Sequence, residues 1–207
     1  ALADYQILDT EDESAFDDIT ELASFICDAP IAVINFIDRD RQWFKSVKGL
    51  DARETPLDVS ICAHAILQSD LFIIPDTTKD RRFSSNPLVT QEPNLRFYAG
   101  ALLKDRDELP LGTLCVLDHQ PRELDERQLS ALQALANQVM ALLELKRSLR
   151  EKQSLIERLE DAQEELAHSA ATDHLTGLLN RRTFENRLTR EFAFIERGGP
   201  EAALLLI

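Results

Sequence analysis

The sequence predicts an α+β protein: an antiparallel sheet with flanking helices, then a long dimeric helix, then the incomplete start of an α/β domain. Three observations support this class. Apolar runs of strand length alternate with short polar turns through the first 120 or so residues. A helical pattern then continues without proline or glycine, and the pattern changes abruptly after it. The predicted parts are an N-terminal segment 1–13, a domain 14–124, a helix 125–170 and a fragment 171–207.

Composition excludes several classes of protein. The chain has 207 residues, 44% of them hydrophobic, and a net charge of −14, which opposes non-specific binding to nucleic acid or anionic lipid. No apolar run reaches membrane-spanning length, and the N-terminus lacks the features of a signal peptide. Cys27, Cys62 and Cys115 are odd in number and form no CxxC pair, which favours reduced thiols in a cytoplasmic protein over disulfides or a zinc site.

The elements of the first domain follow from local patterns. The first dozen residues are polar, and we expect them to lie loosely on the surface. Apolar residues at three- and four-residue spacing predict a helix over 14–28, ended by Ala29 and Pro30. The run 31–37 is almost continuously apolar, as in a strand covered on both faces. Further strands are expected at 42–47, 71–74, 95–104 and 111–118, with a short helix at 61–67 and a loop at 79–94.

The helix 125–170 carries a coiled-coil pattern. Asp125 and Gln128 form a capping box at its start, and its length allows a reach of roughly 70 Å. Apolar side chains recur at the a and d positions of a heptad, and polar Gln138, Lys152 and Gln163 interrupt them. We expect the helix to form a homodimer, either as a simple spacer or as a signalling rod with two alternative packings. The predicted dimer seam is Leu135, Leu142, Leu145, Leu149, Ile156, Leu159 and Leu166.

The last part of the chain begins with a turn signal at Thr176-Gly177. Asn180 is a suitable N-cap for a following helix, and residues 202–207 resemble the first strand of a parallel sheet. One helix and one strand cannot bury a core, so we expect the rest of this domain to be missing.

Several histidines invite a functional interpretation. His168 and His174 lie near the end of the long helix, but neither is followed by the acidic residue that a histidine kinase phosphoacceptor needs. His64 has no second histidine or carboxylate at coordinating spacing, so a structural hydrogen bond is favoured over a metal site. We predict no metal ligands in this chain.

Five segments of the first domain together resemble the GAF sensory family. The resemblance implies a PAS-like antiparallel sheet with helices on one side and a ligand cavity on the other. The segments are 60–66 (SICAHAI), 74–77 (IPDT), 82–88 (RFSSNPL), 95–100 (LRFYAG) and 112–118 (GTLCVLD).

The cavity that this resemblance implies has five candidate residues. Arg96 is open to two interpretations, a clamp for an anionic ligand or a salt bridge at the sheet edge. The aromatic residues could line the cavity or fill the core, and nothing in the sequence selects a ligand. Cys62 and Cys115 could support thiol chemistry or bilin attachment, but core packing is favoured. The candidates are Trp43, Arg96, Phe97, Tyr98 and Cys115.

Residues 173–182 (DHLTGLLNRR) resemble the entry motif of a GGDEF domain, the diguanylate cyclase module. The resemblance implies that two GTP molecules, each held with Mg²⁺ in one subunit of a dimer, are condensed to cyclic di-GMP. The family's first metal-binding aspartate would come beyond Ile207, so this chain should hold no catalytic residue. The motif is expected to couple helix and catalytic domain through Asp173, Leu175, Thr176, Gly177, Asn180, Arg181 and Arg182.

We therefore expect a sensory module that controls a diguanylate cyclase through a dimeric coiled coil. Two alternatives remain: the parent is a non-catalytic receptor for cyclic di-GMP or GTP, or its output is a later domain such as a phosphodiesterase.

Overall fold

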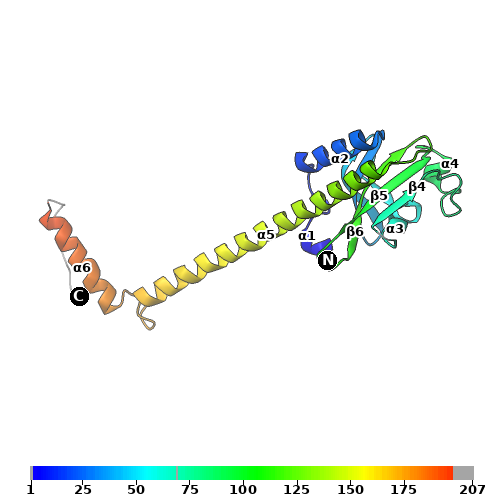
Figure 1. Ribbon diagram of the computed structural model, residues 1–207. Coiled ribbons are helices and arrows are strands. Elements are labelled where there is room, and N and C mark those ends of the chain that lie inside the picture. The colour runs from blue at the N-terminus through cyan, green and yellow to red at the C-terminus, as the bar shows by residue number, and fades with distance from the viewer. Residues whose placement is uncertain (1, 69, 198–207) are drawn as a thin grey trace. The chain divides into compact units, whose positions relative to one another are not determined.

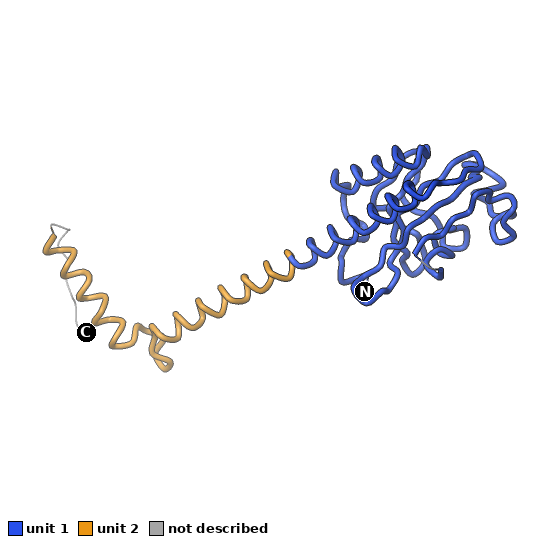
Figure 2. The backbone as a smooth tube through the Cα atoms, in the orientation of Figure 1, with its two compact units in different colours: residues 1–148 blue, residues 149–207 orange. Residues whose placement is uncertain are grey.

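The computed structural model describes residues 2–68 and 70–197, in two compact units that comprise residues 1–148 and 149–207 (Figure 2). The first unit contains one six-stranded antiparallel sheet with the strand order β3-β2-β1-β6-β5-β4. The predicted α+β class is confirmed. The strands are β1 (Ile31–Ile37), β2 (Arg41–Lys48), β3 (Glu54–Pro56), β4 (Leu71–Ile74), β5 (Phe97–Lys104) and β6 (Pro110–Asp118).

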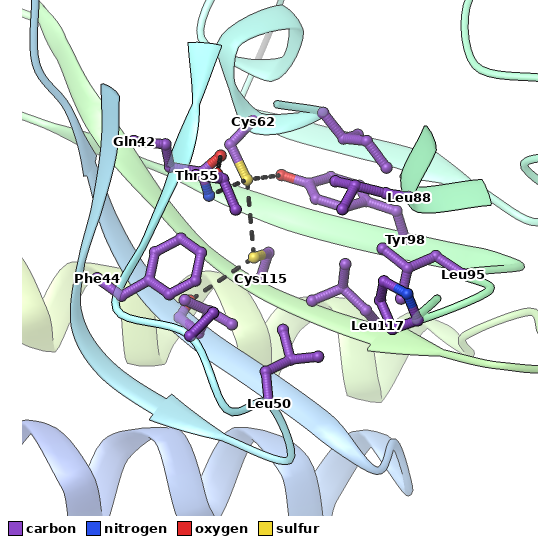
Figure 3. Close-up of a pocket in the computed structure, with 14 residues that line it drawn as sticks. Gln42, Phe44, Leu50, Thr55, Cys62, Leu88, Leu95, Tyr98, Cys115 and Leu117 are labelled. Carbon is purple, nitrogen blue, oxygen red and sulfur yellow. Dashed lines mark hydrogen bonds between the residues drawn. The ribbon is translucent and has the colours of Figure 1, made fainter. Parts of the chain in front are cut away.

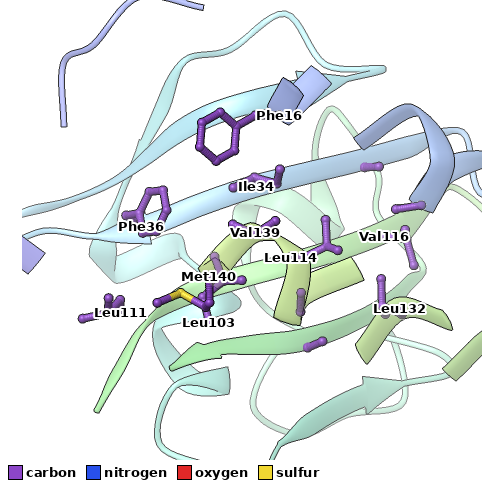
Figure 4. Close-up of a cluster of buried hydrophobic side chains, with 14 of the residues drawn as sticks. Phe16, Ile34, Phe36, Leu103, Leu111, Leu114, Val116, Leu132, Val139 and Met140 are labelled. Carbon is purple, nitrogen blue, oxygen red and sulfur yellow. The ribbon is translucent and has the colours of Figure 1, made fainter. Parts of the chain in front are cut away.

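One face of the sheet is covered by helices α2 (Ser14–Cys27) and α5 (Glu126–Ala171) (Figures 1 and 4). Successive residues of a strand point to opposite faces, so alternate residues of β1 and β5 belong to a helix-side cluster, together with Leu111, Leu114 and Val116 of β6. Ile34 and Leu114 are partners across β1 and β6, and both are fully buried there. From α5 the cluster receives Leu132, Ala136, Val139, Met140 and Leu143.

The other face is covered by short elements. These are the 3₁₀ turn η1 (Leu57–Val59), helix α3 (Cys62–Ala65) and helix α4 (Pro87–Thr90). A second apolar cluster forms between them and the sheet, and its strand residues alternate with those of the helix-side cluster. Because β1, β5 and β6 are covered on both faces, their sequences are apolar almost throughout.

A β-bulge in β2 brings a lysine into the protein interior. Asn35 is the partner of Phe44 and Ile34 is the partner of Ser46, so Lys45 has no partner on β1. Lys45 and Ser46 both reach the helix side, where the Lys45 side chain is fully buried. The Lys45 Nζ atom lies 2.8 Å from a carboxylate oxygen of Glu13 and 5.2 Å from the centre of the Phe16 ring.

The expectation that the first dozen residues lie loosely on the surface was wrong. Helix α1 (Leu2–Tyr5) leads into a segment whose Tyr5 and Ile7 side chains are only 1% and 2% exposed. Both belong to the helix-side cluster, and the Tyr5 hydroxyl donates to Glu144 of α5. Leu2 and Leu8 also pack against this cluster, so four apolar side chains anchor the segment.

Most other elements lie close to their predicted positions, and the differences are short. The predicted helix at 61–67 shrinks to α3, and the loop predicted at 79–94 contains the single turn of α4. Strand β3 was not predicted, because three residues are too few to show an alternating pattern.

Helix α5 begins with the predicted capping box. The Gln128 amide N–H donates to Asp125 Oδ1 at 2.8 Å, and the Asp125 N–H donates to Gln128 Oε1 at 3.0 Å. The second unit also contains helix α6 (Arg181–Glu196), N-capped by Asn180 as predicted. The strand predicted at 202–207 lies outside the described residues. Among the residues that the structure covers, no helix is both long and apolar enough to cross a membrane.

Candidate ligand pocket

A small cavity of about 110 Å³ lies between the sheet and the short elements on its second face (Figure 3). Strands β1, β2, β5 and β6 form its floor, and residues of the 49–55 and 88–95 segments form its wall. Most lining side chains are apolar, and none carries a formal charge when the thiols are protonated. The lining consists of Val33, Gln42, Phe44, Leu50, Ala52, Thr55, Ile61, Cys62, Leu88, Pro93, Leu95, Tyr98, Cys115 and Leu117.

The polar groups of the pocket meet at two cysteine sulfurs. Cys62 Sγ, at the start of α3, lies 3.9 Å from Cys115 Sγ on β6. The Tyr98 hydroxyl and the Gln42 side-chain amide each donate to Cys62 Sγ at 3.3 Å, as Figure 3 shows. Asn35 Nδ2 lies 3.5 Å from Cys62 Sγ and 3.6 Å from Cys115 Sγ. Cys115 in turn donates to the Val33 carbonyl oxygen at 3.7 Å.

These contacts make the two thiols unequal. Burial raises the pKa of the Cys62 thiol, but the hydrogen bonds with Cys115, Thr113, Tyr98 and Asn35 outweigh burial and lower that pKa to about 7. The hydrogen bond with Cys62, followed by burial, raises the pKa of Cys115 well above its ordinary value. A negative charge shared by this pair therefore resides on Cys62, because most of the donors point at that sulfur.

The structure separates the five predicted pocket residues. Tyr98 and Cys115 line the cavity. Trp43 and Phe97 lie in the helix-side cluster, on the face of the sheet opposite to the cavity. The next residue of each strand, Phe44 or Tyr98, points to the cavity face, because successive side chains alternate between the two faces.

Arg96 lies outside the cavity lining and is used by the backbone. Its guanidinium donates to the carbonyl oxygens of Val89 at 2.7 Å and Leu95 at 3.0 Å. This arrangement matches neither the anion clamp nor the salt bridge considered from the sequence. The Arg96 side chain instead fixes the end of the 88–95 segment against β5.

Sequence reasoning did not select Gln42, Asn35 or Cys62 as site residues. Cys62 is buried, as expected, at 3% exposure, but it also lines the cavity. Its neighbour Cys115 is 53 positions away in the chain, so only the sheet and α3 bring the sulfurs together. In the described part of the chain, no cluster of three His, Cys, Asp or Glu residues could hold a metal ion.

The predicted dimer seam divides into two groups. Leu135 and Leu142 are partly buried, because they pack against the helix-side cluster of the first unit. Further along α5 the seam side chains are largely exposed, with values from 49% for Ile156 to 70% for Leu166. The exposed members are Leu145, Leu149, Ile156, Leu159 and Leu166.

The predicted coupling motif forms a tight turn between α5 and α6. Asp173 Oδ1 accepts hydrogen bonds from the Leu175 and Thr176 amides at 3.2 and 3.0 Å, and hydrogen bonds from Thr176 lower the pKa of the Asp173 carboxyl. Gly177 has a φ of +69°, which favours glycine. Asn180 donates to the Ala170 carbonyl at 2.7 Å and caps α6, so one residue connects both helices.

The next residues of the motif begin α6. Arg181 Nε lies 2.8 Å from Glu185 one turn later, and both side chains are exposed. Arg182 follows on the same exposed helix. The motif thus forms the short turn that connects α5 to α6.

A single antiparallel sheet with two helices on one face and a small cavity on the other defines an α+β domain with a candidate ligand pocket. The GAF domain family model matches residues 12–143, so the chain belongs to the GAF domain family. Among solved structures, the GAF domain of a phosphoenolpyruvate-protein phosphotransferase from Coxiella burnetii is similar, with a TM-score of 0.57 and 13% identity. The match covers 72% of this chain and 94% of that one, and it supports the fold alone.

Two curated relatives are similar to this chain in sequence. The chain is 43% identical over 143 residues to the cyclic di-GMP phosphodiesterase PA2567 of Pseudomonas aeruginosa, covering 69% of this chain and 24% of the relative. It is 29% identical over 138 residues to the diguanylate cyclase DgcP of Escherichia coli, covering 66% of this chain and 37% of the relative. The chain thus spans only 24% and 37% of the lengths of these two relatives.

Proposed function

We propose that this chain is the sensory part of a protein that makes or degrades cyclic di-GMP, and that a small ligand in the GAF pocket controls the output through helix α5. One observation carries the proposal. The pocket and α5 lie on opposite faces of the same strands. On β6, Cys115 lines the pocket while its neighbours Leu114 and Val116 pack in the cluster that contains Val139 of α5.

This arrangement provides a short physical route for a signal. A ligand that shifts β6 or β5 by a fraction of an ångström must disturb the packing of α5, since protein interiors are close-packed. Figure 4 shows Val139 and Met140 of α5 among the side chains from β1, β5 and β6. The coupled element is therefore a rigid helix whose position depends on the sheet.

The lining of the pocket defines the class of ligand. Apolar side chains dominate, and the few polar groups come from Gln42, Thr55, Cys62, Tyr98 and Cys115. Anionic ligands are disfavoured, because no lysine or arginine lines the cavity to compensate for the lost hydration of an anion. A volume of about 110 Å³ restricts the ligand to a very small molecule.

Filling the pocket should abolish this response. Ala52 is partly exposed at the cavity wall, and Ala52→Phe would place a ring across the cavity. We expect the variant in the full-length protein to lose ligand-dependent changes in cyclic di-GMP turnover, whereas Ala52→Ser keeps them. Turnover is followed by chromatography of the nucleotides. A full ligand response in Ala52→Phe would show that sensing takes place elsewhere.

The proposal also includes a parallel homodimer formed through the second half of α5. The leucine and isoleucine side chains from Leu145 to Leu166 repeat at heptad spacing and are exposed in a single chain. A water-exposed stripe of this length is unfavourable, and a second copy of the helix covers it with the same pattern. Parallel pairing would bring the two C-terminal domains together.

Charges in this stripe should produce monomers. Leu149→Asp with Ile156→Asp places two carboxylates at a positions, where dimerisation would bury them. We expect sedimentation velocity to show half the mass of the wild-type dimer. The control is Ser154→Asp with His168→Asp, which adds two carboxylates at exposed f positions and should leave the dimer intact. If the Leu149→Asp, Ile156→Asp variant were still dimeric, α5 would not form the dimer interface.

We favour a diguanylate cyclase output. The resemblance of residues 173–182 to the GGDEF entry motif supports this choice, and the motif's turn would fix the angle at which the next domain follows α5. In the complete protein GTP and Mg²⁺ would then be required, with no catalytic residue contributed by this chain. The relative at 43% identity favours a second candidate, a phosphodiesterase output.

One assay separates these outputs. The full-length protein is incubated with GTP and Mg²⁺ in one reaction and with cyclic di-GMP in another. Formation of cyclic di-GMP from GTP supports a cyclase, and loss of added cyclic di-GMP supports a phosphodiesterase. Binding of either nucleotide without turnover supports a receptor and overturns an enzymatic output.

A further inference from the structure

The two cysteines of the pocket have the geometry of a reactive pair. Cys62 Sγ and Cys115 Sγ are 3.9 Å apart, and they are carried by α3 and β6. Both are free thiols that line the same cavity, and their side chains are 3% and 1% exposed. Two sulfurs in contact can form a disulfide after a small movement of one side chain, whereas an isolated thiol cannot.

We propose that Cys62 and Cys115 form a redox pair, which a hydroperoxide entering the pocket oxidises to a disulfide. The apolar lining admits a small neutral oxidant and excludes charged ones. Access is provided by the cavity wall, where Leu50, Ala52, Leu88 and Pro93 are partly exposed. In a reducing compartment such a disulfide is transient, as expected for a sensor.

The chemistry balances in two steps. The Cys62 thiolate attacks the peroxide oxygen that carries hydrogen, the O–O bond breaks, and Cys62 becomes a sulfenic acid. The departing alkoxide takes the proton that the thiol gave up and leaves as an alcohol, or as a first water when the oxidant is hydrogen peroxide. The Cys115 sulfur then attacks the Cys62 sulfur, the S–O bond breaks, and the departing hydroxide takes the Cys115 proton as a second water. The two thiols lose two electrons in total, and the peroxide accepts them.

The surroundings assign the two roles. Tyr98, Gln42 and Asn35 donate to Cys62 Sγ, which stabilises its thiolate and makes it the attacking sulfur. Cys115 donates to the Val33 carbonyl and keeps its proton, so it resolves the sulfenic acid. The third thiol, Cys27, lies in the helix-side cluster, where burial raises its pKa to about 11. Cys27 is therefore an internal control.

The test is disulfide mapping of this chain after brief treatment with hydrogen peroxide at neutral pH. We expect the intact mass to fall by about 2 Da, because two hydrogens leave when the S–S bond forms. Proteolysis without reductant should give one peptide that joins Cys62 to Cys115, with Cys27 still free, and dithiothreitol should restore all three thiols. Three free thiols after treatment, or a disulfide that includes Cys27, would overturn the proposal.

Two variants test the assigned roles. Cys115→Ser should leave the oxidised Cys62 as a sulfenic acid that dimedone labels, and Cys62→Ser should leave Cys115 unlabelled. Labelling of Cys115 in the Cys62→Ser protein would reverse the roles and overturn the mechanism. Cys27→Ser should form the disulfide as the wild type does, and its absence there would overturn the pair. The mapping uses no nucleotide, so its outcome is independent of the cyclic di-GMP output.

Discussion

Gly112→Ala should lower the free energy of unfolding of the GAF domain by about 3 kcal/mol, the upper part of the usual range for overpacking. A Cβ atom at this position would lie 1.9 Å from the Asn35 carbonyl oxygen and 2.8 Å from the Phe36 Cα atom. Both contacts are with the backbone of β1, which pairs with β6 in the middle of the sheet, so no side-chain rotation can relieve them. Thermal unfolding followed by circular dichroism should show a midpoint lower by roughly 6–12 °C.

Gly100→Ala is the matched comparison for this variant. Its Cβ would meet the Tyr98 hydroxyl at 2.4 Å, and the nearest atoms all belong to that side chain. Tyr98 is fully buried, but a side chain can still adjust where a strand backbone cannot, so we expect a smaller loss of about 1–2 kcal/mol. The free energy of unfolding of Gly112→Ala could instead lie within 1 kcal/mol of the wild-type value, as for an ordinary surface substitution. That result would contradict the close approach of β1 and β6.

Glu13→Gln should lower the free energy of unfolding by about 2–3 kcal/mol at neutral pH, because it leaves a buried lysine without its charged partner. Glu13 Oε1 lies 2.8 Å from Nζ of Lys45, whose side chain is fully buried, and Glu13 Oε2 contacts Lys146 of α5. In the variant Lys45 keeps only neutral acceptors, Thr10 Oγ1 at 2.8 Å and the Glu11 carbonyl at 2.6 Å.

The effect should depend on pH in a defined direction. Burial raises the pKa of the Glu13 carboxyl, but hydrogen bonds from Lys146 and Lys45 outweigh burial and place it below its ordinary value of 4.5. A carboxyl whose pKa is lower in the folded state stabilises the fold above the unfolded pKa, and this contribution is lost as the pH falls through the folded pKa. The difference between wild type and Glu13→Gln should therefore be largest near pH 7 and shrink toward about pH 3.

Urea unfolding at several pH values measures this difference. Glu11→Gln is the control, because it makes the same chemical change on an exposed side chain two positions away and should alter stability by less than about 0.5 kcal/mol. Equal urea midpoints for Glu13→Gln and Glu11→Gln at pH 7 would show that the ion pair between Glu13 and the buried Lys45 adds no stability.

The ion pair also connects the N-terminal segment to the proposed signalling helix. Glu13 is the N-cap residue of α2, Lys45 occupies the bulge of β2, and Lys146 lies on α5. One carboxylate therefore holds three elements at the point where α5 leaves the sheet. In Glu13→Gln the loss of the charged contact with Lys146 should weaken the attachment of α5 to the rest of the first unit.

Local patterns in the sequence determined the class of fold and most of its elements. Continuous apolar runs identified β1, β5 and β6, because strands covered on both faces need apolar side chains throughout. The capping box placed the start of α5 and the N-cap Asn180 placed the start of α6, since these bonds join residues three positions apart. The resemblance to GAF segments added the cavity, which no periodic pattern could indicate.

The tertiary structure alone decided which residues form the pocket. The face to which Phe97 or Tyr98 points depends on strand register, and one step along a strand reverses it. The bulge that buries Lys45 and the contact between Cys62 and Cys115 depend on pairings between residues distant in the chain. Such pairings leave no local periodic signal, because the free energy that fixes them comes from packing between elements.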